Sequence, residues 1–156
     1  MDKQNHPTAF GVFKPIDHVL MAFRTEADLH AAETALNHHG FSAEDLTFYG
    51  PKDMLRQTDE DMRNASVLAN IGQELNLVKA HRALAEVGHS FLVVHAPDND
   101  LVMRVSEVAQ QTHATSAQHY GRFIIEELIS SPQGEQQVFE SPERGLDDAP
   151  STGRRS

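Results

Sequence analysis

The chain has 156 residues, no Cys, ten His and a formal net charge of −10 at pH 7. This length suits one domain with tails, and the lack of Cys excludes disulfides, a thiolate nucleophile and zinc sites built on sulfur. The acidic balance argues against nucleic acid or an anionic membrane as the main partner. The sequence shows neither a secretory signal nor an apolar run approaching the ~20 residues of a membrane span, so we expect a cytoplasmic protein.

Composition divides the chain into three parts. We expect residues 1–15 to be a flexible lead, and residues 131–156, rich in Ser, Pro, Gly, Gln and charge, to be a disordered tail. The folded domain is then expected at residues 16–130.

The folded part opens with a strand and a helix. Residues 19–23 are an apolar run of strand length, and Thr25 followed by Asp28 is a capping-box-like start for a helix. Three apolar residues mark one face of that helix: Leu29, Ala32 and Leu36. A short second strand follows and ends in Tyr49-Gly50.

A helical segment follows the first unit. Residues 58–87 have helical periodicity, Thr58 and Asp61 give a start signal, and Gly72 could split the helix. The strand–helix–strand order then repeats. An apolar run at 91–95 precedes a helix that Asp98 should cap, and a short strand ends in Tyr120-Gly121.

The repeat predicts the fold class. Two βαβ units make an α+β, ferredoxin-like four-stranded antiparallel sheet, here with a long helical insertion between the units. The first strand of each unit would be central. The alternative is a three-layer α/β fold with a parallel sheet and crossover helices.

Both central strands are apolar on both faces, which a strand with one wet face would not be. Something must therefore cover the side opposite the helix pair. The inserted helix could do so, or a second subunit could. We expect a homo-oligomer, a dimer formed through this second sheet face. Residues 122–129 could extend the last strand, although symmetry with the first unit favours a short helix.

His95 and His119 are titratable candidates for a ligand site or an interface. His95 takes the position that Phe23 holds in the first unit, and His119 lies in a short outer strand. Such an imidazole could act as a base, or it could be a packed, hydrogen-bonded His. Because a central strand intervenes, we do not expect the two to be adjacent. No His spacing matches a metal pair, so we expect no metal and no cofactor.

Tyr49 and Tyr120 are the only two Tyr of the chain and occupy matching places in the repeat. They are candidates for two phenols that line a pocket at the sheet edges. The structural alternative is that Tyr-Gly terminates a strand, with the ring covering the edge of the core.

The layout resembles the bacterial general stress proteins of the heat-induced YflT type. The matching features are the strand at 20–23, the helix start at 25–28 (Thr-Glu-Ala-Asp), the turn at 40–42 (Gly-Phe-Ser), Asp45 and Leu46. The resemblance extends over residues 16–120. It implies a stress-associated, non-enzymatic module and supplies no catalytic residues.

The inserted segment departs from that family. Family members often carry a Gly/Ala-rich apolar hairpin there, whereas this chain has charged residues at 59–63 and Gln73-Glu74. We expect no membrane-embedded insertion.

Three functions are compatible with these observations. The first is a non-catalytic cytoplasmic protein that acts in a stress response through self-association or a protein partner. The second is a regulatory domain that binds a small molecule at the sheet ends or at a dimer seam. The third is a small cofactor-independent enzyme that uses His95, His119 or the Tyr pair. Function belongs to sites and not to folds, and we expect the first.

Overall fold

The computed structural model describes residues 15–65, 73–122 and 124–129, together with three short strands at 8–9, 12–13 and 138–139. The elements in chain order are β1 (Thr8–Ala9), β2 (Val12–Phe13), β3 (His18–Phe23), α1 (Glu26–His38), a 3-10 turn (Ala43–Asp45), β4 (Leu46–Tyr49), α2 (Pro51–Ala65), α3 (Gln73–Glu86), β5 (Ser90–His95), α4 (Asn99–Gln111), β6 (Ser116–Tyr120), β7 (Ile125–Glu127) and β8 (Val138–Phe139).

The main sheet is antiparallel throughout. Its strand order is β4-β5-β3-β6-β7-β8, and every neighbouring pair runs in opposite directions. The α+β class with an antiparallel sheet is confirmed, and the parallel alternative is wrong. β3 and β5 lie side by side inside the sheet, as predicted for the first strand of each unit.

The connection between β4 and β5 explains the strand direction. The predicted long helix is two helices, α2 and α3, which lie against each other. Two antiparallel helices return the chain to the end of the sheet from which it left, so the next strand runs antiparallel. A single crossover helix would have carried the chain to the opposite end and produced a parallel neighbour.

The starts of three helices follow from local chemistry. The side chains of Thr25 and Asp98 accept the backbone N–H groups three residues on, at 3.1 Å and 2.9 Å, as the capping patterns predict. The predicted start at Thr58 is wrong. α2 already begins at Pro51, whose fixed φ suits a first turn, and Asp53 accepts the Gly50 N–H at 3.0 Å.

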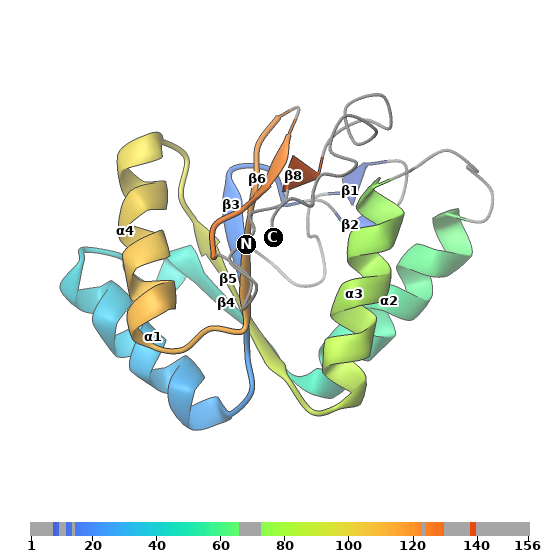
Figure 1. Cartoon of the computed structure of the whole chain (residues 1–156), viewed down its shortest axis with the longest axis horizontal. Helices are drawn as coiled ribbons and strands as arrows, with labels where there is room; N and C mark the ends of the chain where they lie inside the picture. Colours follow the sequence, from blue (N-terminus) through green and yellow to red (C-terminus); the bar gives the residue numbers. More distant parts are fainter. Residues whose placement is uncertain are drawn as a thin grey trace, which may run out of the picture.

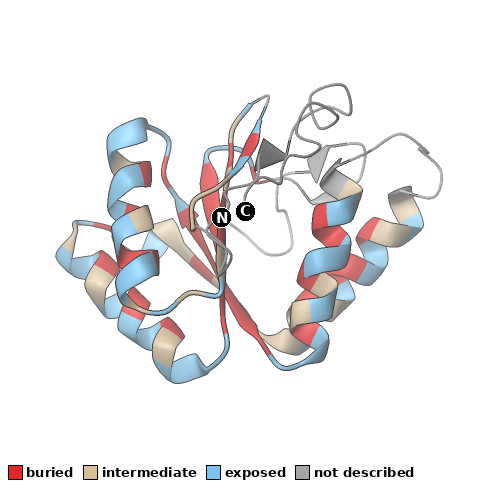
Figure 2. Ribbon diagram, in the orientation of Figure 1, coloured by how far each residue is buried: buried red, intermediate tan, exposed pale blue. Residues whose placement is uncertain are grey.

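The molecule has three layers. Figure 1 shows the sheet edge-on in the middle, with α1 and α4 on one side and α2 and α3 on the other. Val19, Met21 and Phe23 of β3 belong to the core under α1 and α4. Leu20 and Ala22 belong to the core under α2 and α3. The prediction that both faces of the central strands are dry is confirmed, and Figure 2 shows these strands buried along their length.

The inserted helices cover the second face themselves. Met54 of α2 and Leu77 and Ala85 of α3 are buried against Phe91 and Val93 of β5. The chain's own helices therefore occupy the face on which we expected a second subunit. The apolar surplus of the central strands is buried within one chain, and it no longer argues for a sheet-to-sheet dimer.

The prediction of a short helix at 122–129, which symmetry favoured, is wrong. Ile125–Glu127 is the strand β7, and it forms a hairpin with β6. In the turn of this hairpin the Gly121 N–H donates to the Ile124 carbonyl at 2.8 Å. The first unit has Pro51 directly after its Tyr-Gly pair, and Pro starts a helix well. The second unit lacks a proline there, and the buried β-branched Ile125 suits a strand.

Most of the expected lead (1–15) and tail (131–156) lies outside the described residues. In the described parts of these two segments, β1 pairs with β2, and β8 pairs with β7 at the edge of the sheet. In the part of the chain that the structure describes, no helix has the length and apolar character needed to span a membrane.

Candidate functional site

One end of the sheet brings together two of the predicted site residues. The register places His18, the first residue of β3, opposite His95 on one side and opposite Tyr120 on the other. Side chains alternate along a strand, and Leu20, Val93 and Tyr120 all belong to the core under α2 and α3. His18, His95 and Tyr120 therefore form one row on the second face. His18 is the residue that the sequence analysis missed.

Tyr49 lies at the opposite end of the sheet. It pairs with Phe91 at the start of β5, whereas Tyr120 lies beside the end of that strand, across His18. Both rings are buried in the core of the second face. The structure thus places the two phenols at different ends of one core.

The two imidazoles of the row are in direct proximity. The ring centroids of His18 and His95 are 4.9 Å apart, and the ring planes are tilted by 45°. His18 Nδ1 lies 2.9 Å from the Ile16 carbonyl oxygen, and His95 Nδ1 lies 3.9 Å from Asp45 Oδ1. His18 is largely buried, and burial lowers its pKa. The side chain of His95 is 45% exposed, which leaves the pair open to solvent on one side.

His119 belongs to the other face of β6. It lies opposite Glu126 of β7, and burial lowers the pKa of its imidazole. Its neighbour in β3 is Val19, which packs under α1 and α4. The prediction that His95 and His119 are not adjacent is confirmed, because β3 separates their strands.

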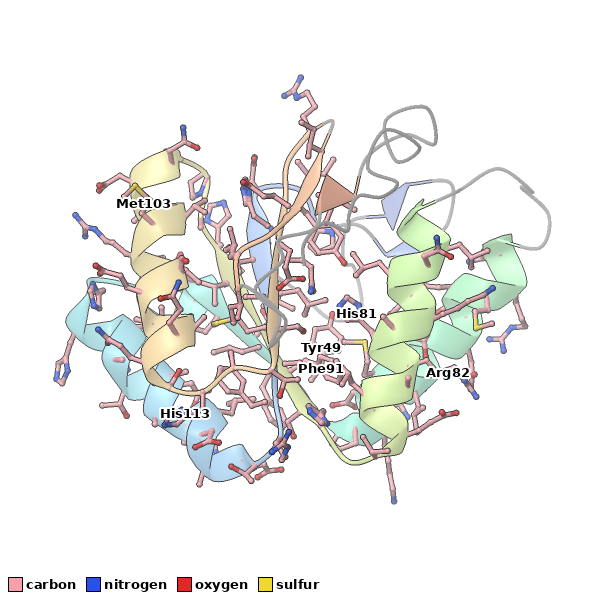
Figure 3. The ribbon with its side chains drawn as sticks, in the orientation of Figure 1. Tyr49, His81, Arg82, Phe91, Met103 and His113 are labelled. Carbon is pink, nitrogen blue, oxygen red and sulfur yellow. The ribbon has the colours of Figure 1, made fainter. Side chains whose placement is uncertain are left out.

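A buried polar chain links the insertion to the sheet. Gln118 of β6 donates its Nε2 to Glu127 Oε1 at 2.7 Å, so its Oε1 accepts from His81 Nε2 of α3 at 2.9 Å. Figure 3 shows His81 reaching from α3 toward the sheet, near Tyr49 and Phe91. The neighbouring Arg82 pairs instead with carboxylates of the two helices, those of Asp59 and Glu86.

This environment keeps both ends of the polar chain from carrying charge easily. Burial lowers the pKa of His81 to about 4, so its imidazole is neutral at neutral pH and donates from Nε2. Burial also raises the pKa of Glu127. A sequence signal for His81 exists: it lies four residues from both Leu77 and Ala85 on the buried face of α3.

Replacing Gln118 with Leu should lower the free energy of unfolding by about 2–4 kcal/mol, because the buried His81 N–H and one Glu127 oxygen lose their partner. Urea denaturation at pH 7.5 measures the change. Gln110→Leu, on the exposed side of α4, is the matched control and should stay within ~0.5 kcal/mol of the wild type. An equally small effect of Gln118→Leu would contradict a stabilising role for the polar chain.

α2 contributes a second group of buried polar residues. Gln57 donates its Nε2 to Asp61 Oδ1 at 2.8 Å, and Thr58 Oγ1 donates to the Leu55 carbonyl at 3.1 Å. All three polar side chains are buried. Thr58 and Asp61 thus lie inside the helix and act in packing and not as a cap.

Within the described residues, no three His, Cys, Asp or Glu side chains come close enough together to hold a metal ion. Comparisons of the chain with known protein families, with curated proteins and with solved structures found no match. Function must therefore be argued from the chain's own geometry.

Proposed function

We propose that the chain is a non-catalytic, stress-associated bacterial protein of the cytoplasm, built on a ferredoxin-like core. Two observations support such a core: the order β4-β5-β3-β6 within the sheet, and the position of α1 and α4 together on one face. The resemblance of residues 16–120 to YflT-type proteins supports the stress association.

One observation carries the non-catalytic part of the proposal. Several buried polar side chains under α2 and α3 are hydrogen-bonded to one another and so are not presented to a substrate, as in the chain from His81 through Gln118 to Glu127. Two of the candidate catalytic residues also lie apart from the row of His18, His95 and Tyr120. Tyr49 lies at the other end of the sheet from Tyr120, and His119 lies on the other face. A nucleophile and its base need to lie within hydrogen-bond reach.

Such a protein acts through contacts with a second copy of itself or with another protein. Both sheet faces are covered within the chain, so these contacts belong to the outer surface. Met103 offers an apolar centre there: it is 69% exposed and lies on the outer side of α4 (Figure 3). Asp100 and Glu107 lie three and four residues from it along α4, so charged positions flank it on the helix surface, as on the rim of an interface.

Light scattering coupled to size-exclusion chromatography tests this proposal over the micromolar range. We expect a mass above the 17.3 kDa of one chain, and we expect Met103→Glu to return it to that of one chain. Val87→Glu is the matched control, because Val87 is 73% exposed but lies in the turn after α3. A single-chain mass at every concentration would overturn self-association. An unchanged Met103→Glu assembly would place the contact elsewhere.

A further inference from the structure

The two imidazoles at the end of the sheet are a site in their own right. We propose that His18 and His95 bind one divalent transition-metal ion of the kind that prefers nitrogen ligands, such as Cu²⁺, Ni²⁺ or Zn²⁺. The inference goes beyond the function proposed above. The site lies within one chain, so it would bind metal whether or not the protein associates.

The backbone holds the two side chains in register. His18 and His95 are directly opposite each other on β3 and β5, and the next pair, Val19 and Val94, is fully buried. Pairing continues on the other side of His18, where the Ala96 N–H donates to the Asp17 carbonyl at 2.8 Å. The two Cβ positions are therefore fixed by hydrogen bonds on both sides, at the 4.5–5.5 Å or so that is typical of opposed residues.

The spacing of the rings fits a shared ion. Two nitrogens bound to a tetrahedral ion at 2.0–2.1 Å lie about 3.3 Å apart. The ring centroids are 4.9 Å apart and tilted by 45°. A centroid separation of 4.9 Å is short enough for one nitrogen of each ring to reach a shared ion by rotation of the two side chains. His89, in contrast, comes just before β5 and His95 is the last residue of that strand, so the length of the strand separates them and they cannot share an ion.

The second nitrogen of each ring already has an oxygen near it. His18 Nδ1 lies 2.9 Å from the Ile16 carbonyl, and His95 Nδ1 faces the Asp45 carboxylate at 3.9 Å. A proton on each Nδ1 leaves the lone pair on Nε2. For His18 this is the arrangement found around metal-bound His, which almost always donates its other N–H to a carbonyl or a carboxylate. At 3.9 Å the Asp45 carboxylate is a charged neighbour of His95 and not its hydrogen-bond acceptor. Among the described residues, the polar contacts of these two rings are made by Nδ1.

The surrounding charge favours a cation over an anion. Asp45 lies beside His95, Asp17 precedes His18, and the chain as a whole carries −10. The exposed side of His95 gives an ion access from solvent. Since no third protein ligand is present among the described residues, water or a ligand from solution would complete the shell. Imidazole ligands select Cu²⁺, Ni²⁺ and Zn²⁺ over Mg²⁺ and Ca²⁺, with Cu²⁺ bound most tightly.

The test uses the full, untagged chain, freed of metal, with Cu²⁺ as the probe. Isothermal titration should show one site that is occupied first, and electron paramagnetic resonance of one equivalent should show two nitrogen ligands. His95→Ala should weaken this site at least tenfold. Because His95 is exposed, that variant should keep the circular dichroism of the wild type. Mg²⁺ in place of Cu²⁺ should give no heat.

His119→Ala is the matched control, since it removes an imidazole from the other face of the same end of the sheet. It should leave the first site unchanged. Equal Cu²⁺ affinity of the wild type and of His95→Ala would overturn the proposal, as would an equal loss in His119→Ala. His18→Ala gives a second reading: if it folds, its affinity should fall like that of His95→Ala, and an unchanged affinity would also overturn the proposal.

Discussion

Replacing Phe91 with Ala is expected to lower the free energy of unfolding by about 3–5 kcal/mol. The ring is fully buried in the core between the sheet and the inserted helices. It also meets His81 of α3 edge to face, with ring centroids 5.8 Å apart. Removing the ring leaves a cavity where α3 packs against β5. The neighbouring strands are rigid and can close that cavity only in part.

Chemical denaturation at neutral pH measures this loss, and Val87→Ala is the control. Val87 is 73% exposed in the turn after α3, so its truncation should change stability by less than ~0.5 kcal/mol. If α3 covers the sheet as described, amide exchange in α2 and α3 should also quicken in Phe91→Ala. A loss below ~1 kcal/mol would contradict the three-layer arrangement.

Acid should destabilise the protein through His81. Its pKa falls from 6.5 in the unfolded chain to about 4 in the folded one, so the unfolded state binds more protons between these values. The stability that the neutral imidazole contributes is fully present above pH 6.5 and is lost as the pH falls toward 4. A shift of this size corresponds to about 3 kcal/mol. The lowered pKa values of His18, His89 and His119 act in the same direction.

His81→Gln isolates this effect, because the amide can still donate to Gln118 while it does not titrate. Urea denaturation at half-unit steps from pH 8 to pH 4 should give a shallower loss for the variant than for the wild type. Glu127, whose pKa is raised, stabilises the folded state as the pH falls, and it is present in both proteins. Parallel curves for the two proteins would mean that His81 does not carry the acid sensitivity.

The secondary structure of the two repeated units was readable from local patterns. The apolar runs, the caps at Thr25 and Asp98 and the paired Tyr-Gly endings mark elements whose signals lie within a few residues of each other. The dry second face was also readable, because β3 and β5 do not alternate with polar residues. The sequence could not show what covers that face, since a helical hairpin and a second subunit bury the same side chains.

The candidate site depended on strand register, which no local pattern encodes. His18 stands just outside the apolar run at 19–23, and only the pairing of β3 with β5 places it beside His95. The same holds for His81 and Gln118, which are 37 residues apart in the chain. The helical period identifies a buried position at His81. The hydrogen-bond partner of the buried imidazole, Gln118, comes from β6 and is not visible in that local pattern.

The hairpin of α2 and α3 leaves the sheet and rejoins it at the same end, between β4 and β5. Two antiparallel neighbours of this kind need only a tight turn to connect them, so the insertion is dispensable for chain topology. A version of this protein with a short loop there would keep the same sheet with one apolar face open, and it would have to find cover from another molecule. The length of one connection thus decides whether the second face of the sheet is covered within one chain or by another molecule. A change in that length is a simple evolutionary route between monomeric and oligomeric forms.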